Sequence, residues 1–258
     1  MATIQKSSAV ATDNDRYSAV IDHTWDAWGP CGGYLASITM RAVEQIAPKD
    51  HRPVTLSCQY LKMPKHGEVV IDVSPSKVGS ASCFNVVLSQ NEIQVVQAQV
   101  WTASERPGPE VSNISMPDVP GPAGLKSITE HLEELGQTIL PIWQNMEGRP
   151  VEFLPNGVGN PKGHRVERWL KVTGWDEPTS PFQDAMRSLV IVDSHVWVAF
   201  SNGVDGQLDF VAQSLALTVW FHDFAPNEQW LLANGRSDTA ASGFVKGQVE
   251  VWTPSGKL

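Results

Sequence analysis

Two stretches of alternating hydrophobic and polar residues, separated by a proline-rich segment, dominate the chain. The first stretch holds four strand-like runs, at residues 54–63, 68–78, 83–89 and 93–102. Their separators are short and polar, which favours antiparallel pairing of consecutive strands. Residues 31–46 precede these runs and have the spacing of a helix, with Leu35, Ile38 and Ala42 on one face and Pro48 beyond the end.

The second stretch repeats this scheme after residues 103–124, whose five prolines and three glycines are typical of a linker. A strand-like run at 165–172 precedes a helix predicted at 181–193, and further strands are predicted at 195–200, 212–222, 230–235 and 244–252. A helix followed by an antiparallel meander, occurring twice, indicates two copies of one α+β unit. We predict an N-terminal unit at 1–105, a linker with a short helix at 106–150, and a C-terminal unit at 151–258.

The run at 212–222 carries no charge and ends in Trp220-Phe221-His222. Its composition predicts a strand that is covered on both faces. The next run begins Trp230-Leu231-Leu232, and the loop between the two is short enough for them to pair directly.

Composition narrows the classes of function. The net charge of -9 and the absence of a basic stripe argue against nucleic acid or an anionic membrane surface as a partner. Asp193 and His195 interrupt the longest apolar run, so no membrane span is predicted. Cys31, Cys58 and Cys83 lack metal-type spacing and are expected to be reduced thiols in a cytoplasmic protein, with a peroxisomal location as the alternative.

Asp193 is the first candidate for chemistry. It continues the stripe of Phe182, Met186 and Leu189 along the predicted helix. A carboxylate on a core-facing stripe is costly unless it is paired or has a function. The alternative is that the helix ends at Val192 and leaves Asp193 in an exposed turn.

The start of the first helix is the second candidate region. Gly32-Gly33-Tyr34 opens it, and bare backbone amides at a helix N-terminus suit an anion or a thioester carbonyl oxygen. Alternatively, the glycines permit a tight turn and close packing. Cys31 precedes them, where the helix dipole is expected to lower the pKa of its thiol, and His23 is a conceivable base. We favour a buried, structural role for Cys31.

The Trp220-Phe221-His222 signature, together with the helix and strands around it, resembles the acyl-CoA thioesterase II-type proteins of the thioesterase-like superfamily. The resemblance implies a double hotdog, in which each antiparallel sheet wraps around one long helix. It also implies hydrolysis of an acyl thioester, either acyl-CoA or a carrier-bound acyl or polyketide group. Asp193 stands at the family's catalytic Asp and Ser214 at its catalytic Ser or Thr. Asp193 would then activate a water held by Ser214, while the Gly33 amide stabilises the oxyanion.

Two departures from the family pattern are visible. The family commonly has Asp-His-Ser where this chain has Ala216-Leu217-Thr218, which predicts a changed pocket with Thr218 as a further candidate. The family's third functional residue is a Gln beyond the equivalent of Leu258, and Gln207 and Gln213 are the substitutes that this sequence offers. Two other functions therefore stay open: a dehydratase, isomerase or cyclase that uses the same pocket, or a non-catalytic acyl-binding module.

No metal or cofactor is predicted. The histidines at 66, 131, 164, 195 and 222 lack metal-type spacing, and no glycine-rich phosphate loop occurs. The expected partner is a small thioester-linked acyl substrate, and a homo-oligomer is left open.

Overall fold

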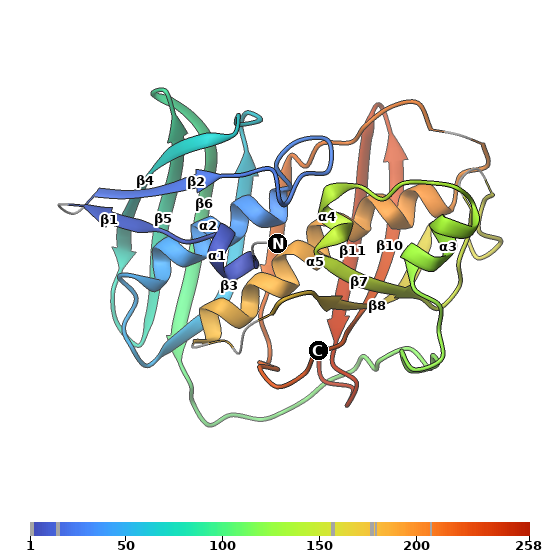
Figure 1. Cartoon of the computed structure of the whole chain (residues 1–258). Helices are drawn as coiled ribbons and strands as arrows, with labels where there is room; N and C mark the ends of the chain where they lie inside the picture. Colours follow the sequence, from blue (N-terminus) through green and yellow to red (C-terminus); the bar gives the residue numbers. More distant parts are fainter. Residues whose placement is uncertain (1–2, 14–15, 156–157, 176–177, 179, 207) are drawn as a thin grey trace.

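Two antiparallel sheets, each packed against one long helix, make up the molecule (Figure 1). The computed structural model describes residues 3–13, 16–155, 158–175, 178, 180–206 and 208–258. The first sheet has the strand order β1-β2-β4-β5-β6-β3-β9 and the second has the order β11-β10-β8-β7. This is the double-hotdog arrangement expected from the sequence.

The first unit wraps its sheet around α2 (Gly32–Glu44). Its strands are β1 (Ala11–Asp13), β2 (Arg16–Ile21), β3 (His51–Tyr60), β4 (Gly67–Lys77), β5 (Ala81–Gln90) and β6 (Ile93–Ser104). The short helix α1 (Ile4–Ser7) lies before them. Leu35, Ile38 and Ala42 are buried on α2, so the face predicted from their spacing is confirmed.

The second unit packs its sheet against α5 (Pro181–Asn202). Its strands are β7 (Met146–Pro150), β8 (Arg165–Val172), β10 (Leu231–Ala241) and β11 (Phe244–Trp252), and α3 (Ile128–Glu134) and α4 (Pro141–Gln144) precede them. The outer face of this sheet is covered by the proline-rich segment, where Trp169 Nε1 donates a hydrogen bond to the carbonyl oxygen of Pro120 at 2.8 Å.

The strand β9 (Ala216–Trp220) joins the two halves of the chain because it pairs with β3 of the first unit. The first unit places β6 between β5 and β3, but no described strand lies between β11 and β9. The second sheet therefore ends at β11 and the first at β9, and residues of both strands line the same cavity.

Several strand predictions were wrong in this second half. Residues 195–200 belong to α5, because packing against β8, β10 and β11 outweighs the strand propensity of their valines and aromatics. The strand predicted at 212–222 is shorter and largely exposed, and Trp220 has 65% of its surface accessible. It does not pair with the run that begins at Trp230. The loop that follows β9 packs on α5 instead, where the Arg187 guanidinium donates a hydrogen bond to the carbonyl oxygen of Ala225 at 2.7 Å.

Two further expectations need correction. The strands β3 and β4 are consecutive but not paired, because β3 lies beside β6 at the other side of the sheet. The segment 106–150 contains the strand β7 in addition to its helices. The boundaries at 105 and 150 stay a prediction. Among the described residues no helix is long and apolar enough to span a membrane.

Candidate active site

A cavity of about 1130 Å³ opens between α5, β9, β11 and the start of α2. Its lining includes the candidates Cys31, Gly32, Asp193, Ser214 and Thr218, which lie far apart in the sequence. Gly33 and Tyr34 do not line it.

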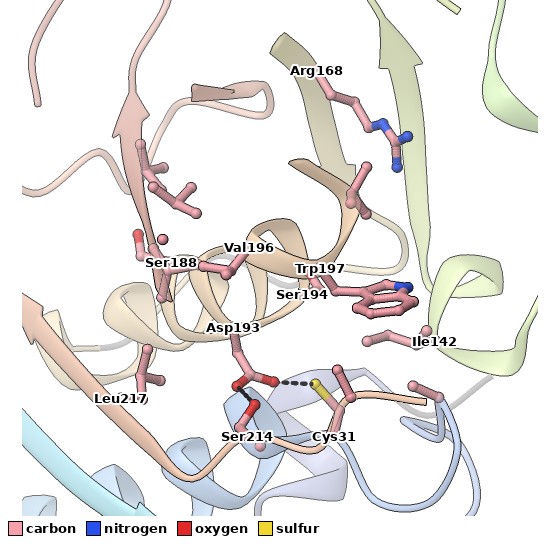
Figure 2. A pocket seen from close by; sticks show the side chains of 18 of the residues that line it. Cys31, Ile142, Arg168, Ser188, Asp193, Ser194, Val196, Trp197, Ser214 and Leu217 are labelled. Carbon is pink, nitrogen blue, oxygen red and sulfur yellow. Dashed lines mark hydrogen bonds between the residues drawn. The ribbon is translucent and has the colours of Figure 1, made fainter. Parts of the chain in front are cut away.

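Asp193 lines this cavity and accepts two hydrogen bonds there (Figure 2). The hydroxyl of Ser214 donates a hydrogen bond to Asp193 Oδ1 at 2.8 Å, and the Cys31 thiol donates one to Asp193 Oδ2 at 3.1 Å. The carboxylate comes from the middle of α5, because this helix continues past the turn considered at Val192. Ser214 lies in the loop before β9. The fold thus brings a helix, a loop and the residue preceding α2 together at one carboxylate.

Gly32 lets the start of α2 approach Asp193 closely. A Cβ at position 32 would lie 2.7 Å from Asp193 Oδ1 and 2.9 Å from Tyr60 Cζ. Tyr60 also donates its hydroxyl to the carbonyl oxygen of Gly32 at 2.8 Å, which ties β3 to α2. The N-terminus of α2 therefore lies directly beside the carboxylate of Asp193.

Gly33 serves a different contact. A Cβ at position 33 would lie 2.4 Å from the carbonyl oxygen of Leu189 and 2.6 Å from Cα of Val190. The two long helices therefore touch through their backbones at this position. Close packing of the helices, the alternative considered for the glycines, therefore explains Gly33. Tyr34 is fully buried, and its hydroxyl donates a hydrogen bond to the carbonyl oxygen of Ser7 at 2.9 Å.

The expectation that the helix dipole lowers the pKa of Cys31 was wrong. Burial, and next to it the charge of Asp193, raise the pKa of the thiol well above its usual value, and the neighbouring amides of Tyr34 and Gly33 only partly offset this. Cys31 is therefore a protonated donor to Asp193. His23, considered as its base, lies instead beside Asp26, with Nδ1 at 3.4 Å from Oδ2.

The remaining polar candidates take different positions. Thr218 Oγ1 lies 3.4 Å from Ser57 Oγ across the pairing of β9 with β3. Gln213 lines the cavity, and Gln207 lies outside the described residues. Gln213 makes no hydrogen bond to Asp193 among the described residues.

A second polar group in the same cavity was not predicted from the sequence. Arg168 on β8 lines the cavity, is 8% exposed and stacks over the Trp143 ring at 5.4 Å. Trp143 also contacts the buried His195, with ring centroids 5.5 Å apart. The sequence signal for Arg168 is its charge at an inward-facing position of a strand, between the apolar residues Val166 and Leu170.

His23, Asp26 and His66 form a group outside the cavity that could hold a divalent metal ion. Their ligand atoms all lie within 4.8 Å of one another, and both imidazoles approach Asp26 Oδ2. Two histidines and a carboxylate are a common donor set for transition metals. The sequence gives no signal for this group, because His66 is far from His23 and Asp26 along the chain and only the fold brings the three together.

Comparison with known proteins gives a consistent picture. Residues 21–103 match the model of the acyl-CoA thioesterase N-terminal domain, and residues 117–258 match that of the acyl-CoA thioesterase C-terminal domain. No curated protein matches the sequence significantly.

Solved structures share the whole fold at low sequence identity. A hotdog-fold protein of unknown function from Alicyclobacillus acidocaldarius is 19% identical, with a TM-score of 0.81 over 98% of this chain and 92% of that chain. An acyl-CoA thioesterase II from Mycobacterium marinum is 17% identical, with a TM-score of 0.74 over 98% of this chain and 93% of that one. A tesB protein from Mycobacterium avium subs paratuberculosis is 19% identical, with a TM-score of 0.75 and the same two shares covered.

Proposed function

Because this chain belongs to the acyl-CoA thioesterase family, we propose that it hydrolyses acyl thioesters in the cavity around Asp193. The observation that carries the proposal is the doubly hydrogen-bonded carboxylate of Asp193, which faces the cavity from the middle of α5. Hydrolysis needs a base to activate water, and Asp193 is the carboxylate that both Cys31 and Ser214 contact.

In the proposed reaction Asp193 accepts a proton from a water molecule as the water oxygen attacks the thioester carbonyl carbon. The carbonyl oxygen gains negative charge in the tetrahedral intermediate. The Gly32 amide, at the start of α2 and on the cavity lining, replaces the Gly33 amide as the group that stabilises this charge. Collapse of the intermediate breaks the carbon–sulfur bond, and the proton held by Asp193 leaves with the thiol product.

Ser214 and Cys31 position the base in this mechanism. Each donates a hydrogen bond to a different oxygen of Asp193, so the carboxylate is held in one orientation with its remaining lone pairs free for the water. The raised pKa of Cys31 argues against a thiolate nucleophile and an acyl-enzyme intermediate.

The test is release of free thiol from a panel of acyl-CoA and carrier-bound acyl thioesters, with wild type and Asp193→Asn. A general base contributes about 10²–10⁴-fold to the rate, so Asp193→Asn is expected to lower kcat by that range while the protein stays folded. Asp205→Asn is a matched control, because that carboxylate caps the Gly159 amide and does not line the cavity. Unchanged turnover in Asp193→Asn would place the chemistry elsewhere.

Cys31→Ser separates the water mechanism from a thiol mechanism. Serine keeps a donor toward Asp193, so turnover is expected to stay within about threefold of wild type, which is the scale of a small change in one hydrogen bond. A loss of about a hundredfold or more (~2.7 kcal/mol of barrier) with the fold intact would promote Cys31 to nucleophile.

A further inference from the structure

Arg168 is a buried cation for which the described part of the protein supplies no anionic partner. Its side chain forms no ion pair or hydrogen bond with a described residue, and Nε is buried without an acceptor. Burial lowers the pKa of its guanidinium to about 10, and no described carboxylate opposes this shift. The pKa still leaves the side chain charged at neutral pH.

The surroundings of Arg168 do not compensate for the buried charge. Its guanidinium lies over the Trp143 ring at 5.4 Å, and the neighbouring His195 is held neutral because burial and the charge of Arg168 lower its pKa to about 3. A buried guanidinium is normally paired with an acceptor that matches its planar fork. This one is unpaired beside an open cavity.

The position of Arg168 relates it to the site of the chemistry. Arg168 and Asp193 line the same cavity, and Figure 2 shows the Arg168 side chain extending from its strand on the same side of the view as Trp197 and Ile142. Ile142, Val196 and Trp197 also line the cavity and provide apolar surface for a hydrocarbon chain.

We propose that Arg168 binds the carboxylate at the far end of the acyl group, so that the substrates are thioesters of dicarboxylic acids. This inference rests on the proposed hydrolysis and names its substrate class. The thioester carbonyl would lie at Asp193, the methylene chain along Ile142 and Val196, and the terminal carboxylate at the guanidinium. A carboxylate on the acyl chain fits better than a phosphate of CoA, because Arg168 is only 8% exposed and lies in the lining of the cavity.

The test compares acyl-CoA pairs of equal chain length, one ending in a carboxylate and the other in a methyl group. Wild type is expected to show the higher kcat/KM for the carboxylate-ended thioester. Arg168→Met keeps the aliphatic stem and is expected to lower that kcat/KM by about 10- to 100-fold, the effect of losing a charge-assisted hydrogen bond, while the methyl-ended thioester changes little. Arg149→Met is the matched control, because Arg149 lies on the neighbouring strand and already pairs with Glu147.

A binding measurement separates failure of this inference from failure of the hydrolase proposal. Non-hydrolysable CoA thioethers with carboxylate or methyl ends are titrated calorimetrically into wild type, Arg168→Met and Arg168→Lys. Tighter, Arg168-dependent binding of the carboxylate-ended thioether supports the inference even where no thioester is hydrolysed. The inference is overturned if wild type binds the carboxylate-ended and methyl-ended thioethers equally well, or hydrolyses the two matching thioesters equally well, whether or not the variants fold. Equal weakening of both thioethers and of CoA alone in Arg168→Met also overturns it, in favour of a phosphate contact.

Discussion

The two units of this protein are built on the same plan, but only one of them is closed. In the first unit the sheet wraps α2 without a break, and the buried part of α2 contains no Asp, Glu, Lys, Arg or His. In the second unit no described strand lies between β11, where its sheet ends, and β9 of the other sheet, and α5 buries Asp184, Arg187 and His195.

The two units contribute different parts of the cavity. The closed unit is a scaffold that contributes the start of α2 and the edge strand β3, while the open unit provides the cavity and the polar side chains that face it. Buried Asp, Glu, Lys, Arg and His side chains lower stability unless they are satisfied, and among the described residues the second unit buries Arg168, Asp184, Arg187 and His195, whereas the first unit buries only His51. Each prediction below tests part of this division.

The largest expected effect is on the contact between the two helices. Gly33→Ala places a Cβ against the backbone of α5 at Leu189, and backbone atoms cannot move aside as a side chain can. The substitution is therefore expected to lower the free energy of unfolding by about 3 kcal/mol, the upper range for overpacking. Gly32→Ala is the matched control, because its nearest atoms belong to the side chains of Asp193 and Tyr60. It should reduce turnover more than stability. Thermal unfolding of both variants measures this, and an unchanged Tm for Gly33→Ala would contradict the close helix contact.

A smaller effect concerns pH and the polar interior of the open unit. His195 has its pKa lowered from 6.5 to about 3 by burial and by Arg168, so below pH 6.5 the unfolded state binds a proton that the folded state does not. Stability is therefore lost as pH falls from about 6.5 toward 3, by about 2 kcal/mol at pH 5 from this group.

Denaturant unfolding between pH 5 and 8 checks this dependence. His195→Gln should flatten it, whereas His222→Gln, which replaces an exposed histidine, should leave the slope unchanged. Equal slopes in wild type and His195→Gln would show that another group controls the pH dependence.

A still smaller effect is expected at Ser214. Ser214→Ala removes one hydrogen bond to Asp193, with a net contribution of about 0.5–1.5 kcal/mol, so turnover should fall by about 2- to 13-fold. If both side chains serve one water, the loss in the Asp193→Asn, Ser214→Ala double variant should be far less than the product of the single losses. Steady-state kinetics of the four proteins decides this, and fully multiplicative losses would separate the two roles.

The smallest effect is expected from cutting the proline-rich segment. Residues 105–113 are exposed, whereas β9 pairs with β3 and α2 packs on α5. Limited proteolysis there should leave the two fragments associated on native gel filtration, with activity retained. Separation of the fragments would show that the connecting segment, and not the packing, holds the units together.

The sequence by itself determined the elements whose patterns are local. The helix α2 and the strands β4, β5, β6, β8 and β11 lie close to their predicted positions, because alternation or helical spacing and clear turn residues coincide there. Asp193 and Ser214 were reached through the family resemblance of the residues around Trp220, and not through spacing alone.

Only the tertiary structure decided the features that depend on contacts between distant segments. Residues 195–200 have strand-like composition but continue α5, since the surrounding sheet buries that helix face. The short strand β9 crosses to the first unit, because β3 offers it a free edge. Cys31, Asp193 and Ser214 meet at one carboxylate, and Arg168 is buried without a partner, because side chains from separate elements converge on one cavity. No local pattern encodes such convergence, since it depends on how whole helices and sheets pack.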